Sequence, residues 1–395
     1  MRWILWVGLV AFGAYAAEVV AVGDRFKDSS KCKACHNHLV TQWEGSWHAK
    51  SHYDSDEYIQ KTIDYIARKS RKSLNAIKIE CAACHNPRIS VTSTTAEYEA
   101  IASLHLDKDS AATKALQSDT ISEGINCVVC HNVDQIHDEL PESKRGIHRV
   151  NWMQSGIMVG PFADASSPYH KVESRDFMNT DPNQLCFVCH ANDTSEEGHQ
   201  FVNMQAEFKS DGKQCVDCHM GPRIEGVAAT LRDRSGKQHK RSIREHGFKG
   251  AHTEAMWQGA LKVDAVKKGN NVEVTLRNPQ PHSLPSGFGA REILIEAHYA
   301  SGGKVIKTES LSLTSRFLTK RKKPTIPHLA KTTVENSAIP AQSAKTFLLP
   351  LARGADEVSI QVSYRLINDE VRGLLDLKEP IWSKKMKIDK INLKL

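Results

Sequence analysis

The chain has no cysteine outside five short motifs, so none is left over for a structural disulfide. All ten cysteines of its 395 residues belong to copies of the pattern Cys-x-x-Cys-His. After residue 16 it also has no run of apolar residues long enough to cross a bilayer. A disulfide-stapled scaffold and a protein with several membrane spans are therefore excluded.

The five motifs predict covalently attached c-type haem. Two thiols three residues apart lie on one side of a helical turn, where they can add to the vinyl groups of one porphyrin, and the histidine that follows binds the iron as proximal ligand. Histidine makes up only 19 of 395 residues, so chance does not place it after every Cys-x-x-Cys pair. Zinc fits poorly, because no motif has zinc-finger spacing. We expect five haem c groups, attached to Cys32, Cys35, Cys81, Cys84, Cys127, Cys130, Cys186, Cys189, Cys215 and Cys218, with His36, His85, His131, His190 and His219 as proximal ligands.

The first 16 residues predict a secretory signal peptide. Arg2 forms a short basic region, Trp3 to Gly13 an apolar region, and Ala14 to Ala16 a cleavage site, so the mature chain would begin at Ala17. A retained membrane anchor is the alternative, although roughly 14 apolar residues is short of the about 20 that a span needs. Thiols of this kind receive haem outside the cytoplasm, which agrees with export. We expect a periplasmic or exported protein without a transmembrane span in its mature form.

Charge divides the chain into two parts. Residues 1–260 carry 30 Lys plus Arg against 33 Asp plus Glu, whereas residues 261–395 carry 23 against 13. Haem propionates would add negative charge to the first part, so we expect an acidic haem domain and a basic C-terminal domain. The net charge of +7 is then no argument for nucleic-acid binding. The basic runs at 320–323 and 384–387 are either solvated faces or a patch that docks an acidic partner or the haem domain.

The haem motifs are crowded. They occupy 188 residues from Cys32 to His219, which leaves under 40 residues for each haem. With so little polypeptide for each large apolar ring, the porphyrins must form much of the core and pack closely together. Short helices and loops are expected between them, with helices at about 55–73 and around Tyr98 to Leu104.

After about residue 258 the pattern changes to alternating strands. Residues 268–271 predict a hairpin turn. About seven strands and no helix indicate a β-sandwich, with strands at 261–266, 272–276, 291–299, 303–313, 344–351, 357–366 and 384–393. We therefore predict an α/irregular multihaem cytochrome domain at 17–258, with haems as its core, followed by an all-β sandwich-like domain at 259–395 that binds no haem.

The sixth iron ligand decides the function. A haem with two protein ligands transfers electrons, whereas one with an open position can bind a small molecule. Beyond the five proximal histidines the chain has 14 others. This surplus favours ligation of every iron by two histidines.

Several segments resemble the cytochrome c-554-like family of multihaem cytochromes. The segment 43–49 resembles a W-x-x-S-x-H-A element whose histidine is a distal ligand in that family. Similar elements recur at 124–127, 160–161, 167–170, 218–220 and 246–252. The resemblance covers roughly 30–252, and the fifth haem and the β-domain depart from the smaller, four-haem members of the family.

This resemblance implies that His48, His170, His246 and His252 are distal ligands. His137, six residues after His131, is the fifth candidate. Histidines held in reserve are His52, His148, His199 and His282. The loop around His282, at 278–287, resembles an H-x-L-P-x-G loop in β-domains attached to such cytochromes, and it either packs the domain or reaches a haem edge.

Three functions remain open. The first is an exported carrier that passes single electrons between redox proteins in an anaerobic or nitrogen/sulfur-linked respiratory chain, with a membrane quinol oxidase as candidate donor and a terminal reductase as candidate acceptor. The second is an oxidoreductase in which one five-coordinate haem acts on a small nitrogen or sulfur compound. The absence of a Cys-x-x-Cys-Lys motif weakens this alternative. The third is a subunit of a haem filament.

Overall fold

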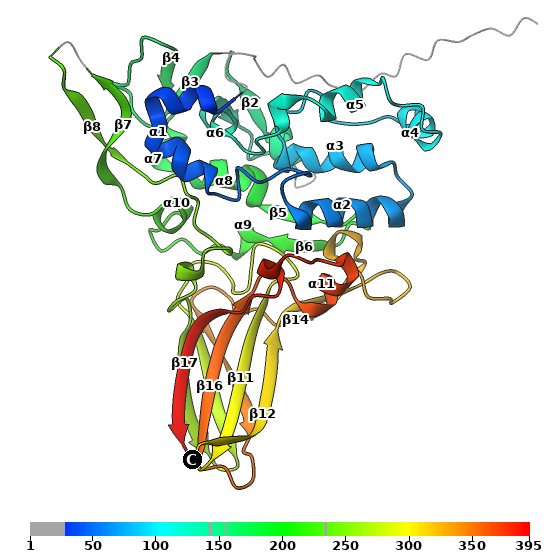
Figure 1. The fold of residues 1–395 in the computed structure, drawn as a ribbon, viewed down its shortest axis with the longest axis vertical. Coiled ribbons are helices and arrows are strands. Elements are labelled where there is room, and N and C mark those ends of the chain that lie inside the picture. Colours follow the sequence, from blue (N-terminus) through cyan, green and yellow to red (C-terminus); the bar gives the residue numbers. More distant parts are fainter. Residues whose placement is uncertain (1–27, 142–143, 155, 233–234) are drawn as a thin grey trace, which may run out of the picture.

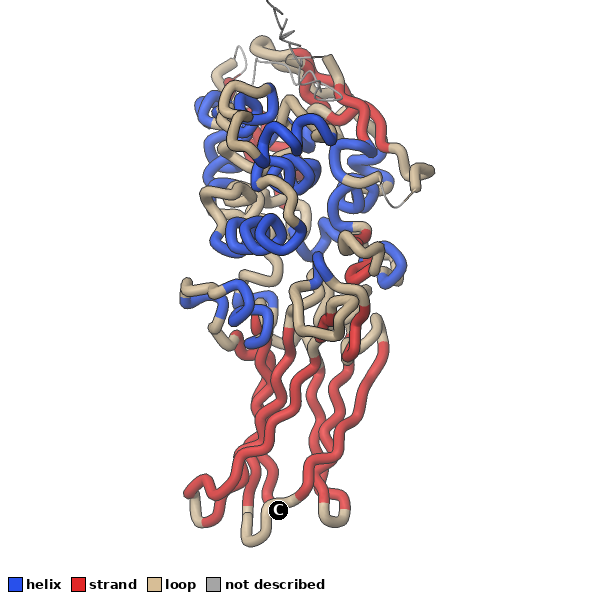
Figure 2. Tube along the Cα trace, turned by 90° about the vertical axis from the view of Figure 1, so that its right-hand side faces the viewer, coloured by secondary structure: helices blue, strands red, loops and turns tan. Residues whose placement is uncertain are grey.

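The computed structural model describes residues 28–141, 144–154, 156–232 and 235–395. The molecule is elongated, with its helices in one half and a β-sandwich in the other (Figures 1 and 2). The expected signal peptide at 1–16 lies outside the described residues. Over the described ranges, no helix has both the length and the apolar character of a membrane span.

The helical half contains the five haem motifs. Its helices are α1 (Ser30–Glu44), α2 (Glu57–Ser70), α3 (Leu74–His85), α4 (Ala96–Ser103), α5 (Ala111–Leu116), α6 (Cys127–His131), α7 (Phe177–Thr180), α8 (Asn183–His190), α9 (Met204–Glu207) and α10 (Cys215–His219). The helices expected at 55–73 and near Tyr98 correspond to α2 and α4. Side chains cap several of them, as when Asp56 accepts a hydrogen bond from the Ile59 amide at the start of α2.

Short β-pairs connect these helices where the sequence predicted loops. They are β1 (Val133–Ile136) with β2 (Val150–Trp152), β3 (Ile157–Gly160) with β4 (Lys171–Ser174), β5 (Asn192–Thr194) with β6 (Gln200–Asn203), and β7 (Ile224–Arg232) with β8 (Gln238–Ile243). Such pairing satisfies backbone groups that would otherwise lack hydrogen-bond partners. The β7–β8 hairpin extends from the helical half and contacts α1 (Figure 1).

The other half confirms the predicted β-sandwich. One sheet has the order β15-β10-β9 and the other β12-β11-β16-β17, and all pairs are antiparallel. A further pair joins β13 to β14. The strands are β9 (Lys262–Lys268), β10 (Asn271–Asn278), β11 (Glu292–Ser301), β12 (Lys304–Leu313), β13 (Ser315–Leu318), β14 (Thr332–Asn336), β15 (Ser343–Pro350), β16 (Glu357–Arg365) and β17 (Met386–Lys394).

The expectation of no helix in this half is wrong, because α11 (Asp369–Leu375) follows β16. Asn368 caps α11 by accepting a hydrogen bond from the Val371 amide, and acidic residues fill the first turn. Val371 and Leu375 bury the inner side of the helix. The stop after β16 and the cap are both visible in the sequence, but so short a helix has little periodicity to reveal it.

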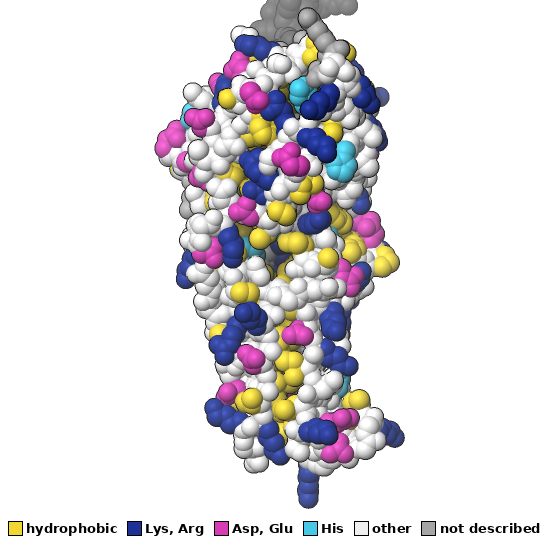
Figure 3. All heavy atoms as spheres, turned by 90° about the vertical axis from the view of Figure 1, so that its left-hand side faces the viewer, with side chains coloured by type: hydrophobic (Ala, Val, Ile, Leu, Met, Phe, Trp, Pro, Cys, Tyr) yellow, Lys and Arg dark blue, Asp and Glu magenta, His cyan; other side chains and the backbone are white. Residues whose placement is uncertain are grey.

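One apolar core joins the two halves. Inward side chains of β10, β11 and β16 alternate with outward ones, and Val274, Ile295 and Ile360 are fully buried. The same core includes Ile59 and Ile63 of α2. On the face shown in Figure 3, charged side chains of both signs are scattered over the helical half, and apolar side chains gather along the middle of the sandwich between charged ones. The two halves therefore share a continuous hydrophobic core and are not independent domains joined only by a linker.

Candidate haem sites

Each Cys-x-x-Cys-His motif lies at a helix end or a break in a helix. α3, α6, α8 and α10 end at His85, His131, His190 and His219, and the helical geometry of α1 breaks at His36. In these four motifs the two cysteines and the histidine thus share the last helical turn. This is the local geometry that attachment of one porphyrin to two thiols and one imidazole requires.

Hydrogen bonds at Nδ1 orient most of these histidines. Nδ1 of His36 lies 2.7 Å from the Ala228 carbonyl oxygen, Nδ1 of His131 lies 2.8 Å from that of Val159, and Nδ1 of His219 lies 2.6 Å from that of Lys249. Nδ1 of His85 lies 2.9 Å from the hydroxyl oxygen of Ser51. Bonding at Nδ1 holds the ring and leaves Nε2 for a metal, as in other histidine metal sites.

Four of the five motif histidines face a second histidine across a similar gap. Ring centroids are 6.4 Å apart for His36 and His170, 6.2 Å for His190 and His48, 6.2 Å for His131 and His246, and 6.5 Å for His219 and His282. Two imidazoles that bind one metal at about 2.0 Å through Nε2 have centroids about 6.3 Å apart. All four separations fit an iron between the rings.

The second histidines are held in the same way as the first. Nδ1 of His246 lies 3.0 Å from the Arg244 carbonyl oxygen, and Nδ1 of His282 lies 2.9 Å from that of Ser283. The corresponding distance from His170 to the Lys171 carbonyl oxygen is 3.3 Å. Burial lowers the pKa of His48 to about 3 and that of His246 to about 4, so both imidazoles are neutral, the form that binds metals.

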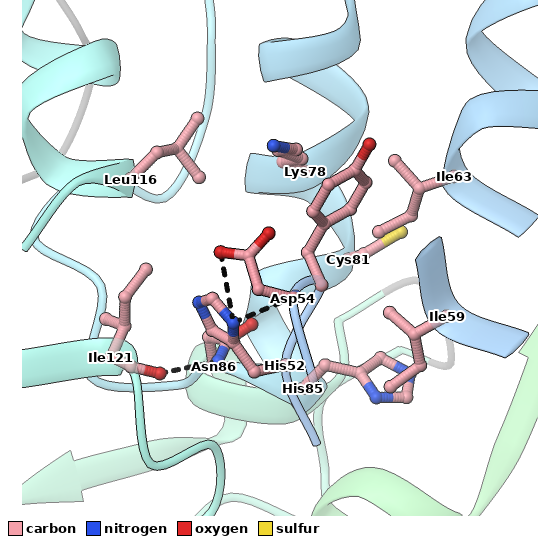
Figure 4. Close-up of a pocket in the computed structure, with 11 residues that line it drawn as sticks. His52, Asp54, Ile59, Ile63, Lys78, Cys81, His85, Asn86, Leu116 and Ile121 are labelled. Carbon is pink, nitrogen blue, oxygen red and sulfur yellow. Dashed lines mark hydrogen bonds and ion pairs between the residues drawn. The ribbon is translucent and has the colours of Figure 1, made fainter. Parts of the chain in front are cut away.

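The motif histidines have internal space in front of them. His85 and His190 expose much of their surface, yet burial among protein atoms lowers the pKa of each to about 4. Exposed area in so desolvated a place must open onto the interior. A pocket beside α3 reaches Cys81 and His85, and Ile59, Ile63, Leu116 and Ile121 form much of its wall (Figure 4). Thiol, imidazole and apolar wall are the groups that hold haem c.

His85 differs from the other four motif histidines. Among the described residues, which include all 19 histidines, none forms a ring pair with His85 at the 6.2–6.5 Å seen for the rest. His52 lines the same pocket, but its Nδ1 lies 3.7 Å from the carboxylate of Asp54 (Figure 4). The distal side of the His85 site is therefore built differently.

The attachment thiols of different motifs lie close to one another. The pKa of Cys127 is lowered chiefly by the Cys32 thiol, that of Cys84 by the Cys189 thiol, and that of Cys215 by the Cys186 thiol, so the two thiols of each pair are neighbours. These contacts join the first motif to the third, the second to the fourth, and the fourth to the fifth. Haems attached there would have their edges in close proximity.

The remaining candidates lie elsewhere. His252 stacks on Trp47 with centroids 3.7 Å apart, and Nδ1 of His137 lies 3.0 Å from a Glu139 carboxylate oxygen. Nε2 of His199 lies 2.7 Å from the Thr333 hydroxyl, and His148 lies in the turn Gly146–Arg149. Among the residues that the structure describes, His137, His199 and His252 make no ring pair with a motif histidine.

Sequence reasoning missed two residues beside the His85 site. Arg145 precedes Gly146, whose position is packed against Cys84, and the positive charge of Arg145 lowers the pKa of His85. The pKa of His328, from the β-sandwich half, is lowered by burial and then by the charges of Arg145 and His85. No local pattern marks either residue.

Comparisons with known proteins show what this chain resembles. A family model for cytochrome c554 and c-prime matches residues 80–149, which contain the second and third motifs. The fold resembles the crystal structure of a penta-heme cytochrome c552 from Thermochromatium tepidum, with a TM-score of 0.70, 17% sequence identity, and coverage of 93% of this chain and 98% of that chain. The fold of this chain is thus that of a multihaem c-type cytochrome. No curated protein sequence matches this chain.

A second solved structure, Northeast Structural Genomics Consortium target SoR45, covers 34% of this chain at 9% identity and a TM-score of 0.16, which is too low to inform the fold.

Proposed function

We propose that this cytochrome is an exported pentahaem electron carrier in which two histidines hold each of four irons. The observation that supports it most directly is the set of four histidine pairs at 6.2–6.5 Å. Irons closed by two protein ligands exchange electrons without binding substrate. The bound haem supplies the redox chemistry, and the chain supplies attachment, orientation and insulation from water.

The ligand assignments follow from these pairs. We assign His170 to the haem of His36, His48 to that of His190, His246 to that of His131, and His282 to that of His219. Three of these distal ligands were expected from the family resemblance. His282 was a reserve candidate, and in this assignment its loop supplies an iron ligand as well as packing the β-domain. We place the boundary between the two domains at residue 258, so that the β-domain occupies 259–395.

The thiol contacts indicate the route of the electrons. The neighbouring thiols of Cys32 and Cys127, of Cys84 and Cys189, and of Cys186 and Cys215 support a route in which the haem of His190 would lie beside those of His85 and His219. The haem of His131 adjoins that of His36. A carrier of this shape would receive electrons at one end and release them at another.

Charge and export suggest the partners. The haem domain becomes acidic once propionates are counted and the β-domain stays basic, so oppositely charged redox proteins would dock at different places. A periplasmic location with a cleaved signal peptide fits a membrane quinol oxidase as donor and a terminal reductase as acceptor, in a nitrogen- or sulfur-linked respiratory chain.

Electron paramagnetic resonance of the ferric holoprotein tests the carrier. A pyridine haemochrome assay should give five haems per chain. The resonance spectrum should show that four of these haems are low-spin. Replacing His170 by Ala should convert one low-spin haem to high spin. His239→Ala, in strand β8, is the control and should leave all signals unchanged. Fewer than four low-spin haems in the wild type would overturn the assignments.

A second function is favoured by one observation, the lack of a paired ring at His85. An iron held by His85 alone would bind a small nitrogen or sulfur compound and could transform it with electrons from the other haems. Carbon monoxide binding to the reduced protein at one equivalent per chain is the expected result. No binding would exclude this second function and leave the carrier intact.

A further inference from the structure

Ser51 is a buried residue whose hydroxyl hydrogen-bonds a motif histidine. Its relative exposure is 6%, and its Oγ lies 2.9 Å from Nδ1 of His85. A neutral histidine that binds iron through Nε2 carries its proton on Nδ1, so with haem attached Nδ1 of His85 donates and the Ser51 hydroxyl oxygen accepts. Ser51 therefore influences the proximal ligand of this site without contacting the iron.

The acceptor at His85 differs in kind from the acceptors at three other motif histidines. Nδ1 of His36, His131 and His219 faces a backbone carbonyl oxygen. A carbonyl oxygen carries more negative charge than a neutral hydroxyl oxygen, so it draws the Nδ1 proton more strongly and makes the imidazole a better electron donor to iron. Stronger donation stabilises ferric iron over ferrous iron. The weaker acceptor at His85 therefore makes its haem easier to reduce.

Backbone contacts hold Ser51 in place. Its amide donates to the His48 carbonyl oxygen at 3.2 Å, and its own carbonyl oxygen accepts a hydrogen bond of 3.1 Å from Nδ2 of Asn86. Asn86 directly follows His85, and its Nδ2 also lies 2.8 Å from the Ile121 carbonyl oxygen (Figure 4). The backbone of Ser51 is thus tied to the motif that its hydroxyl serves, which fixes the distance between hydroxyl and imidazole.

The distal side of the same site acts in the same direction. Among the described residues His85 has no ring pair, whereas each of the other four motif histidines faces a second histidine. A second imidazole adds electron density to the iron, so an iron without one is easier to reduce. The proximal and the distal side of the His85 site therefore both raise its reduction potential.

We propose that Ser51 is a positioning residue that keeps the His85 haem the first of the five to be reduced, so that electrons entering the chain collect there. It acts through His85, by setting how strongly that imidazole donates to the iron. The inference rests on the proposed function, because it needs five attached haems and the four assigned histidine pairs. It gives the electron route a direction, towards the haem that the second function would use.

A spectroelectrochemical titration of the holoprotein tests this role of Ser51. Ser51→Ala removes the acceptor, and we expect the highest of the five midpoint potentials to rise. At a fixed potential the ratio of ferrous to ferric iron in that haem should increase about fivefold, which corresponds to about 40 mV for one electron. Ser51→Thr keeps a hydroxyl and should keep the wild-type potential, whereas Ser51→Val has the shape of threonine without the hydroxyl and should show the rise. The Thr and Val pair decides the question if the Ala variant loses haem.

Ser195→Ala is the matched control. Ser195 is also 6% exposed, and its hydroxyl donates to the Ala330 carbonyl oxygen at 2.6 Å instead of bonding a histidine. This variant should change the ferrous-to-ferric ratio of each haem less than about twofold. Equal potentials in the Thr and Val variants, or a rise confined to one of the lower potentials, would overturn the proposal and leave the carrier intact. Fewer than five haems in the wild type would instead contradict the proposed function itself.

Discussion

Trp382 donates its indole N–H to a carboxylate oxygen of Glu57 at 2.6 Å, and so ties the β-sandwich half to the start of α2. The same carboxylate accepts the backbone N–H groups of Lys378 at 2.8 Å and Glu379 at 2.9 Å. Three donors from one half thus converge on one side chain of the other. The joint lies close to the apolar core that the halves share, beside Tyr58.

Glu57→Ala should weaken this joint. It leaves three donors without their acceptor, and we expect the free energy of unfolding to fall by about 2–3 kcal/mol. Urea denaturation of the holoprotein measures the change. Lys61→Ala, one turn along α2, is the matched control and should cost less than about 0.5 kcal/mol. Equal stability of the two variants would show that the joint contributes little.

His282→Ala should open one iron. The β-domain would then no longer supply the proposed second ligand opposite His219, and we expect one low-spin haem per chain to become high-spin, with new carbon monoxide binding. Electron paramagnetic resonance measures the conversion. His298→Ala, on β11 and hydrogen-bonded to Thr308, serves as control and should leave the spectrum unchanged. A wholly unchanged spectrum in the His282 variant would rule out this ligand.

Gly146→Ala should impair haem attachment at Cys84. Gly146 has φ +59°, and a Cβ there would lie 2.0 Å from the Ala83 carbonyl oxygen. Gly198, with φ +72° and open space around it, is the control for backbone strain alone, which costs about 1 kcal/mol. We expect haem content to fall only in the Gly146 variant, as measured by pyridine haemochrome per protein. Equal haem content in both variants would contradict the close packing.

Asp56 should make stability depend on pH. Burial raises its pKa from 3.8 to about 6, so the folded chain holds this proton up to a higher pH than the unfolded chain does. Stability associated with Asp56 is therefore greatest at low pH and is lost as pH rises from about 4 to about 6.

Asp56→Asn keeps a cap oxygen for the Ile59 amide but does not titrate. Relative to wild type, we expect this variant to gain up to about 3 kcal/mol of stability between pH 4 and pH 6.5. Thermal denaturation at the two pH values measures the difference. Asp56→Ala, which loses the cap, should be less stable than the Asn variant at both. A constant difference between Asn variant and wild type would show that Asp56 has an ordinary pKa.

Much of the fold was predictable because it is written in local patterns. The strands at 261–266 and 272–276 alternate apolar and polar residues, and β9 and β10 extend those ranges by a few residues. Short helix α11 and the small β-pairs among the haem motifs were not predictable. Their signals span too few residues, and tertiary contacts decide whether such segments pair or coil.

The haem sites also have features that local sequence patterns predict and features that they do not. By itself the sequence determined the attachment chemistry, because two thiols and an imidazole within five residues are brought together by a single helical turn. Only the tertiary structure decided which histidine faces which iron site, because partners such as His36 and His170 are 134 residues apart and no periodicity links them. It also set His252 against Trp47, paired His219 with His282 of the β-domain, and left His85 without a ring partner among the described residues. These contacts form when segments that are distant in the chain pack together, and local sequence patterns do not predict such packing.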